Sequence, residues 1–167
     1  IAVEKDQKMC EILKETLKDY KNVKVINGDI LKIENWKLEI GNYKLVANIP
    51  YYLTSPLIRR FLENPPNGKQ PKGLVLMIQK EVAQRICASP PKMSILAVSV
   101  QFYAKAKIMS YVKKENFWPK PKVDSAIIKI IPYRSPASVN TDLFFKIVKA
   151  GFSQPRKQLV NNLTGLK

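Results

Sequence analysis

Histidine is absent from the 167-residue sequence, and cysteine occurs only at Cys10 and Cys87. Without His the chain lacks the commonest general base and the commonest metal ligand. Two cysteines so far apart, in no paired pattern, indicate neither a disulfide framework nor a zinc site. Catalytic triads and zinc-dependent hydrolysis are therefore nearly excluded, and we expect no metal.

Acidic residues are also scarce, because 13 Asp and Glu stand against 29 Lys and Arg and leave a formal net charge of +16. No apolar run approaches the roughly 20 residues of a membrane span, and no charged-then-apolar leader precedes the first helical pattern. An apolar content of 46% can build a hydrophobic core and argues against disorder. We therefore expect a soluble, cytoplasmic protein with no membrane partner.

The positive charge is mixed with aromatic residues in one part of the chain. Between Lys105 and Lys122 there are six lysines and a single acid, Glu115, together with Tyr111, Phe117 and Trp118. Basic groups beside aromatic rings suit a polyanion whose bases can stack. A solvated lysine-rich surface would have the same composition, so charge alone favours nucleic acid only modestly.

Strand-like and helical patterns alternate along most of the chain. Short apolar runs predict buried strands at residues 23–26, 45–47 and 74–78, and apolar spacing predicts helices at residues 9–20, 55–62 and 81–88. Residues 95–103 could form a helix or a strand, and their length favours a helix. Such alternation predicts an α/β fold whose parallel sheet is covered by helices on both faces. Two further strand-like runs, 108–112 and 125–131, have no helix between them and should pair as an antiparallel hairpin at the sheet edge.

The pattern changes to helices alone towards the C-terminus. Apolar spacing predicts one helix around residues 143–148 and a second that begins near Pro155. We therefore place a domain boundary close to Pro136. Residues 1–136 would form the α/β domain, and residues 137–167 the beginning of a C-terminal helical domain.

Three polar residues follow predicted strands, at Glu4, Asp29 and Asn48. In an open parallel sheet, ligands bind beyond the carboxyl ends of the strands. Glu4 could accept the two hydroxyl protons of a ribose, and Asp29 could accept the exocyclic amine of an adenine. Each acid taken singly is more often a cap of the next helix or turn, so the functional interpretation depends on the set of three.

The segment Asn48-Ile49-Pro50-Tyr51 is the most informative part of the sequence. A purine amino nitrogen is a poor nucleophile because its lone pair is delocalised into the ring. The Asn48 side chain and the Pro50 carbonyl could accept its two N–H groups and favour a pyramidal nitrogen, while Tyr51 stacks on the extruded base. This chemistry needs no titratable base. The alternative is a strand followed by a proline turn and a buried Tyr.

Six segments resemble those of one enzyme family, the small-subunit ribosomal RNA adenine N6,N6-dimethyltransferases (the KsgA family). They are residues 2–6, 27–29, 48–52, 79–85, 117–126 and 152–157. Each segment alone is a weak signal, but in this order and at these spacings they are highly specific. The resemblance runs along the whole chain.

The resemblance implies a class I methyltransferase domain of Rossmann-like fold, with S-adenosylmethionine as methyl donor. Glu4 would hold the donor's ribose and Asp29 its adenine, while Asn48 would contact both donor and target adenine. The base site would be completed by Ile49, Pro50, Tyr51 and Phe117, with Trp118 as a substitute for Phe117. Phosphates would be bound by Lys120, Lys122, Arg156 and Lys157.

The family's activity is the transfer of two methyl groups in succession to N6 of each of two neighbouring adenines near the 3′ end of small-subunit rRNA. We therefore expect the partners to be this RNA and the assembling small ribosomal subunit, and we expect a monomer. Catalysis would come from positioning and electrostatics rather than from covalent or metal chemistry.

The sequence departs from the family pattern at three places. Pro155 stands where the family's FxxRRK-like motif has an Arg, which removes one phosphate contact. The family's first strand and Gly-rich loop are missing, since the chain contains no Gly-x-Gly, and the helical domain stops after about two helices. We therefore interpret the chain as a fragment that lacks the N-terminal Gly-rich motif and most of the C-terminal domain.

Two alternative functions remain open at this point. The first is a large-subunit rRNA adenine N6-methyltransferase of the erythromycin-resistance type, which performs the same chemistry on another RNA. The segments 123–126 and 152–157 favour the small-subunit group. The second is a noncatalytic RNA-binding assembly factor on a methyltransferase scaffold, which would not need the amine-binding geometry of Asn48-Ile49-Pro50-Tyr51.

Overall fold

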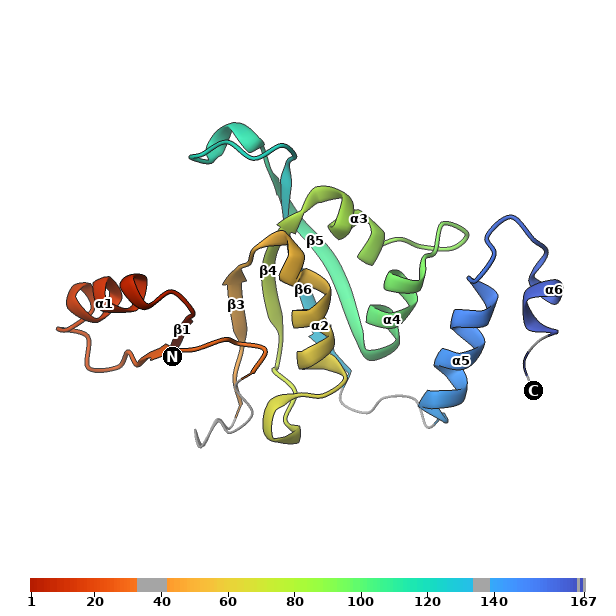
Figure 1. The fold of residues 1–167 in the computed structure, drawn as a ribbon, viewed down its shortest axis with the longest axis horizontal. Helices are drawn as coiled ribbons and strands as arrows, with labels where there is room; N and C mark the ends of the chain where they lie inside the picture. The colour runs from red at the N-terminus through yellow and green to blue at the C-terminus, as the bar shows by residue number, and fades with distance from the viewer. Residues whose placement is uncertain (33–41, 134–138, 165, 167) are drawn as a thin grey trace. The chain divides into compact units, whose positions relative to one another are not determined.

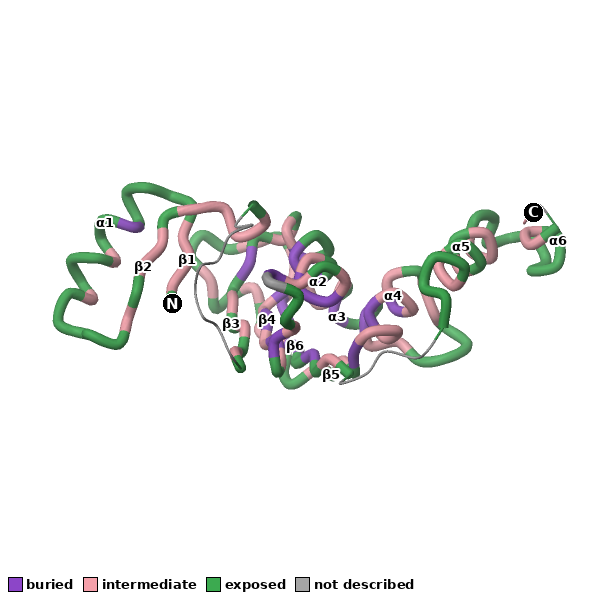
Figure 2. The backbone as a smooth tube through the Cα atoms, turned by 90° about the horizontal axis from the view of Figure 1, so that it is seen from below, coloured by how far each residue is buried: buried purple, intermediate pink, exposed green. Residues whose placement is uncertain are grey.

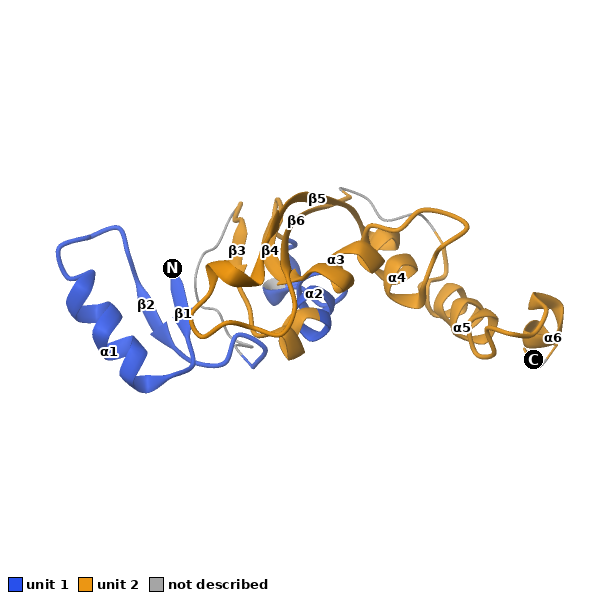
Figure 3. Cartoon of the chain, turned by 90° about the horizontal axis from the view of Figure 1, so that it is seen from above, with its two compact units in different colours: residues 1–41, 55–70 blue, residues 42–54, 71–167 orange. Residues whose placement is uncertain are grey.

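The computed structural model describes residues 1–32, 42–133, 139–164 and 166. The chain forms two compact units, the first made of residues 1–41 and 55–70, the second of residues 42–54 and 71–167 (Figure 3). The domain boundary predicted near Pro136 lies outside the described residues. Within the described part of the chain, every helix is too short or too polar to cross a lipid bilayer.

The first unit contains two parallel strands joined by a helix. Strand β1 (Ala2–Glu4) pairs with β2 (Val25–Asn27), and Glu4 lies opposite Asn27. Between them, α1 (Gln7–Thr16) begins after its N-cap Asp6, whose carboxylate accepts the Met9 N–H at 3.0 Å. All residues of helix α2 (Thr54–Leu62) except Thr54 belong to this unit, and the short 3-10 helix η2 (Pro66–Gly68) follows α2.

The second unit is built on a four-stranded sheet with the order β3-β4-β6-β5 (Figure 1). Strands β3 (Leu45–Asn48) and β4 (Leu74–Gln79) are parallel, whereas β6 (Ser125–Pro132) is antiparallel to both β4 and β5 (Ala104–Val112). The predicted antiparallel hairpin therefore exists and β5 forms the sheet edge. The α/β fold class with an antiparallel edge is confirmed.

The core of the second unit lies on one face of this sheet. Alternate residues of β4 are fully buried, and each lies opposite a buried residue of β6: Leu74 with Ile130, Leu76 with Ile128, and Ile78 with Ala126. Helices α3 (Lys80–Ile86) and α4 (Ile95–Tyr103) also bury apolar side chains (Figure 2). Because every second residue of β4 is buried, the pairing register of β4 with its neighbours is fixed, up to the carboxyl end of the strand.

The C-terminal helices of the second unit are α5 (Thr141–Gly151) and α6 (Leu159–Leu163). Helix α5 packs on α4 through aromatic rings, with the Phe102 and Phe144 rings stacked 4.4 Å apart. The sequence predicted a start near Pro155 for α6, but the helix begins at Leu159, so Arg156 and Lys157 lie in the preceding loop. Proline is compatible with a helical first turn but does not require one.

Strand β5 is longer than the pattern predicted, since it begins at Ala104 instead of Ile108. Its first residues alternate between small apolar and charged side chains, with Ala104 buried and Lys105 and Lys107 exposed. This is the alternation of a half-solvated strand. Because alanine has a weak preference for strands, the sequence pattern does not show the start of β5.

Candidate functional site

The segment Asn48-Ile49-Pro50-Tyr51 leaves the carboxyl end of β3 as an exposed turn. The Asn48 side chain is exposed and makes no hydrogen bond to any residue the structure describes. Ile49 is only 8% exposed and anchors the turn. The Pro50 carbonyl accepts the Leu53 N–H at 2.9 Å, which opens the 3-10 helix η1 (Tyr51–Leu53). Because a carbonyl oxygen has two lone pairs, it can accept a second N–H.

The Tyr51 side chain is held in place by its hydroxyl group. Its hydroxyl lies 3.2 Å from the Ser125 hydroxyl oxygen, and Ser125 is 1% exposed at the start of β6. The neighbouring Tyr52 is 76% exposed. The hydrogen bond therefore holds the partly exposed Tyr51 ring in one orientation beside the Asn48 turn, as a stacking surface requires.

Asp124, one residue before Ser125, joins three parts of the second unit. Its backbone carbonyl accepts the Lys80 N–H at 3.0 Å at the start of α3. Its carboxylate accepts the Lys114 N–H at 3.2 Å and lies 3.5 Å from the Lys80 ammonium, which also lies over the Tyr111 ring. The sequence pattern predicts no separate role for Asp124 or Ser125. It marks them only as members of the segments 117–126 and 123–126.

The environment of Asp124 predicts a pH dependence of stability. The Lys114 hydrogen bond and the Lys80 ammonium lower the pKa of the Asp124 carboxyl, against an opposing effect of burial. Between the folded and the unfolded pKa of Asp124, the unfolded chain binds more protons than the folded chain. The contribution of Asp124 to the free energy of unfolding is therefore complete above about pH 4 and is lost as the pH falls through the folded pKa.

We therefore expect the Asp124→Asn variant to be less stable than the wild type at pH 7. Urea denaturation between pH 7 and pH 2.5 should show the difference in unfolding free energy shrink below about pH 4. Asp19→Asn, at an exposed position of the first unit, is the matched control. A difference that stays constant over this range would contradict the assignment.

Glu4 and Asp29 lie together at the carboxyl ends of β1 and β2. The Glu4 carboxylate accepts the Asp6 N–H at 2.8 Å through one oxygen. The Asn27 side-chain amide donates to the Glu4 and Lys5 carbonyls, each at 3.1 Å, which holds the two strand ends together. The other Glu4 carboxylate oxygen has no hydrogen-bond partner among the described residues.

Asp29 caps the turn that follows β2, which is the structural role that an acid at this position can have. Its carboxylate accepts the Leu31 N–H at 3.0 Å and pairs with the Lys5 ammonium at 3.2 Å. The Leu31 hydrogen bond is the main cause of a lowered pKa of Asp29, with Lys5 second. A carboxylate offers about four lone-pair positions, so these contacts leave room for a ligand N–H.

The basic residues predicted for RNA have different environments. Lys120 pairs with Glu115 at 3.1 Å and lowers the pKa of that carboxyl, whereas Lys122 is exposed and has no acidic partner in the described chain. Both lie in the loop between β5 and β6, together with half-buried Phe117. Arg156 and Lys157 are exposed between α5 and α6.

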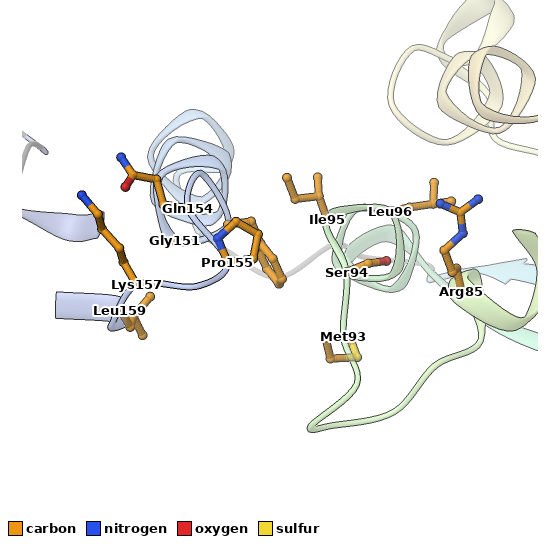
Figure 4. Close-up of a pocket in the computed structure, with 11 residues that line it drawn as sticks. Arg85, Met93, Ser94, Ile95, Leu96, Gly151, Gln154, Pro155, Lys157 and Leu159 are labelled. Carbon is orange, nitrogen blue, oxygen red and sulfur yellow. The ribbon is translucent and has the colours of Figure 1, made fainter. Parts of the chain in front are cut away.

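Lys157 also lines a cavity of about 670 Å³, which the sequence pattern does not predict. The cavity lies between the start of α4 and the loop after α5, with Arg85 and Lys157 on opposite sides (Figure 4). Its other walls are mainly apolar and include Ile95 and Pro155. Among the described residues, no group of three or more His, Cys, Asp or Glu side chains could hold a metal ion.

The whole chain can be compared with known protein families. The family model for "Ribosomal RNA adenine dimethylase" matches residues 1–167. The chain belongs to the ribosomal RNA adenine dimethylase family. The resemblance seen in the sequence is thereby confirmed.

Relatives of this chain include the ribosomal RNA small subunit methyltransferase A of two bacteria. The chain is 43% identical to the Bacillus pumilus protein over 97% of its own length and 58% of the relative's. It is 41% identical to the Clostridioides difficile protein over 99% of its own length and 60% of the relative's. The chain therefore spans less than two thirds of these relatives.

Two solved structures have the same fold as this chain. A dimethyladenosine transferase from Plasmodium falciparum is 32% identical and superposes with a TM-score of 0.81, over 96% of this chain and 57% of that one. The 23S rRNA methyltransferase ErmE is 24% identical with a TM-score of 0.79, over 96% of this chain and 64% of that one. The Rossmann-like methyltransferase fold is thus confirmed, and ErmE supports the fold alone.

Proposed function

We propose that this chain carries the catalytic region of an S-adenosylmethionine-dependent rRNA adenine N6,N6-dimethyltransferase. Its substrate would be two adjacent adenines near the 3′ end of small-subunit rRNA. The observation that carries the proposal is the turn after β3, where an exposed Asn48 amide, a Pro50 carbonyl and an anchored Tyr51 ring occur in succession. The names of the relatives favour the small subunit over the large one.

The residues of this turn have complementary tasks towards the adenine amine. The Asn48 side-chain oxygen and the Pro50 carbonyl accept its two N–H groups, which draws the nitrogen lone pair out of conjugation with the ring. Tyr51 stacks on one face of the extruded base and Phe117 on the other. Ile49, buried below the turn, keeps the two acceptors in place. The amine is neutral when it reacts, so no base has to remove a proton before the N–C bond forms and the donor's C–S bond breaks. The proton that the methylated nitrogen then carries would be released to water.

The first unit offers the groups for the methyl donor. When bound, S-adenosylmethionine supplies a methyl group made electrophilic by its positive sulfur. The unpartnered oxygen of Glu4 fits a ribose hydroxyl, and Asp29 can accept one further N–H from the adenine of the donor. Asn48 would contact both donor and target. Residues 1–136 would form this methyltransferase domain, and residues 137–167 the beginning of a helical domain.

RNA binding would depend on exposed cations. Lys122, Arg156 and Lys157 can contact phosphates directly, whereas Lys120 must first leave or share its bond to Glu115. The partners would be small-subunit rRNA and the assembling small ribosomal subunit. The enzyme would act as a monomer in the cytoplasm, where that subunit is assembled.

The proposal predicts a defined methylated product. The protein in its full natural length is incubated with methyl-labelled donor and small-subunit RNA, and the digested RNA is analysed for N6,N6-dimethyladenosine. We expect the label at two adjacent adenines and none in large-subunit RNA. Label in large-subunit RNA alone would overturn the substrate, and absence of transfer to either RNA would overturn the activity.

A further inference from the structure

The loop between β5 and β6, residues 113–124, presents a tryptophan side chain to solvent. Trp118 is 98% exposed, and no other large apolar side chain in the described part of the chain is as exposed. The adjacent Phe117 is half-buried. A Trp ring is usually well buried, so a ring left free on a loop tip is the kind of group that binding partners cover.

This loop is held in shape by its own contacts. The Asp124 carboxylate accepts the Lys114 N–H at 3.2 Å, and Lys114 is the first residue of the short 3-10 helix η3 (Lys114–Asn116). The Asn116 N–H bonds to the Lys113 carbonyl at 3.0 Å. Figure 1 shows the loop projecting beyond the ends of β5 and β6. Because the loop is already ordered, little conformational entropy is lost when Trp118 meets a ligand.

The charges of the loop indicate which class of ligand Trp118 would bind. Its two acids are both paired, Glu115 with Lys120 and Asp124 with Lys80. Lys113 and Lys122 are exposed and have no acidic partner among the described residues. An exposed aromatic ring between unpaired cations matches a single-stranded nucleic acid, in which bases stack and phosphates follow the backbone. A membrane surface would instead suit an amphipathic helix, and the loop contains none.

We propose that Trp118 is a stacking surface for an unpaired base of the RNA substrate, separate from the base held by Tyr51 and Phe117. This inference rests on the proposed function. The backbone at Phe117 is extended, with φ −119° and ψ 146°, and in extended chains successive side chains point to opposite sides. The target base therefore meets Phe117 on one side of the loop, while a neighbouring base of the same strand stacks on Trp118 on the other.

Tryptophan fluorescence tests this directly, because comparing variants with and without Trp118 isolates the emission of that ring. The Trp36→Phe variant of the full-length protein is titrated with a short single-stranded adenine-rich RNA, without methyl donor. The signal of Trp118 is obtained by subtracting the Trp36→Phe, Trp118→Phe double variant. We expect the Trp118 emission to be quenched by the single strand, and much less by the same RNA in a duplex.

Affinity measurements separate stacking from charge. Trp118→Ala should weaken binding of the single strand by about fivefold to a hundredfold, and Trp118→Phe by less, because the ring remains. The matched variant Lys122→Gln should keep the quenching and reduce the slope of log K against log salt by about 0.7. Since Trp118 and Lys122 are both exposed, we expect all three variants to keep the wild-type circular dichroism spectrum.

Three outcomes would overturn the inference. They are absence of quenching by RNA, equal quenching by single strand and duplex, and a response only to vesicles containing phosphatidylserine, which would assign the loop to a membrane surface. Methyl transfer without quenching would remove this inference and keep the proposed function. Quenching without methyl transfer would remove the proposed function and keep Trp118 as an RNA-binding residue.

Discussion

Replacing Asn48 by Ala should abolish methyl transfer and leave RNA binding nearly unchanged. The side chain is exposed and makes no hydrogen bond to any described residue, so its removal costs the fold little. The substitution would remove one of the two acceptors that we propose for the target amine. By comparison with the loss of one oxyanion-hole donor, about 2.7–4 kcal/mol of transition-state stabilisation, we expect turnover to fall by at least about 100-fold to 1,000-fold.

Single-turnover methyl transfer to small-subunit RNA, with RNA affinity measured in parallel, checks this expectation. The matched control is Asn42→Ala, because Asn42 is an exposed Asn of the same unit that precedes β3. The control should retain full activity. Unchanged turnover in Asn48→Ala would show that Asn48 does not hold the amine, and an equal loss of RNA affinity would show that it acts in binding instead.

Replacing Glu4 by Gln should weaken binding of the methyl donor by about tenfold to a hundredfold. The unpartnered oxygen of the Glu4 carboxylate would accept a ribose hydroxyl proton in a charge-assisted hydrogen bond of about 1.5–3 kcal/mol. An amide keeps one acceptor oxygen and turns the other position into a donor. That remaining oxygen can still accept the Asp6 N–H, so the start of α1 should be preserved.

Isothermal titration calorimetry of S-adenosylmethionine with the full-length protein gives the affinity. Glu11→Gln changes the charge in the same way at an exposed position of α1 and should leave the affinity unaltered. Urea denaturation of both variants shows whether the fold is intact. If Glu4→Gln binds the donor as tightly as the wild type, Glu4 is only a local cap of the β1–α1 turn and not a ribose ligand.

Much of the local structure could be predicted because it depends on neighbours in sequence. Asp6 is the N-cap of α1, Asp29 caps the turn after β2, and residues 95–103 form α4 as their length suggested. Helix spacing, caps and turns are set by contacts within a few residues. The start of β5 could not be predicted, because Ala104 and Ala106 acquire strand structure only by pairing with Pro132 and Ile130 of β6.

The candidate site, too, has features that the sequence predicts and features that only the tertiary structure decides. The sequence by itself placed Glu4, Asp29 and Asn48 after strands and identified the family from motifs in order. Only the tertiary structure paired Tyr51 with Ser125, 74 residues apart, joined Lys80 to Asp124, and separated exposed Trp118 from half-buried Phe117. Such contacts depend on strand order and on which face of the sheet is buried. A linear pattern does not contain that information, because a one-residue shift in register would turn the same side chains to the opposite face.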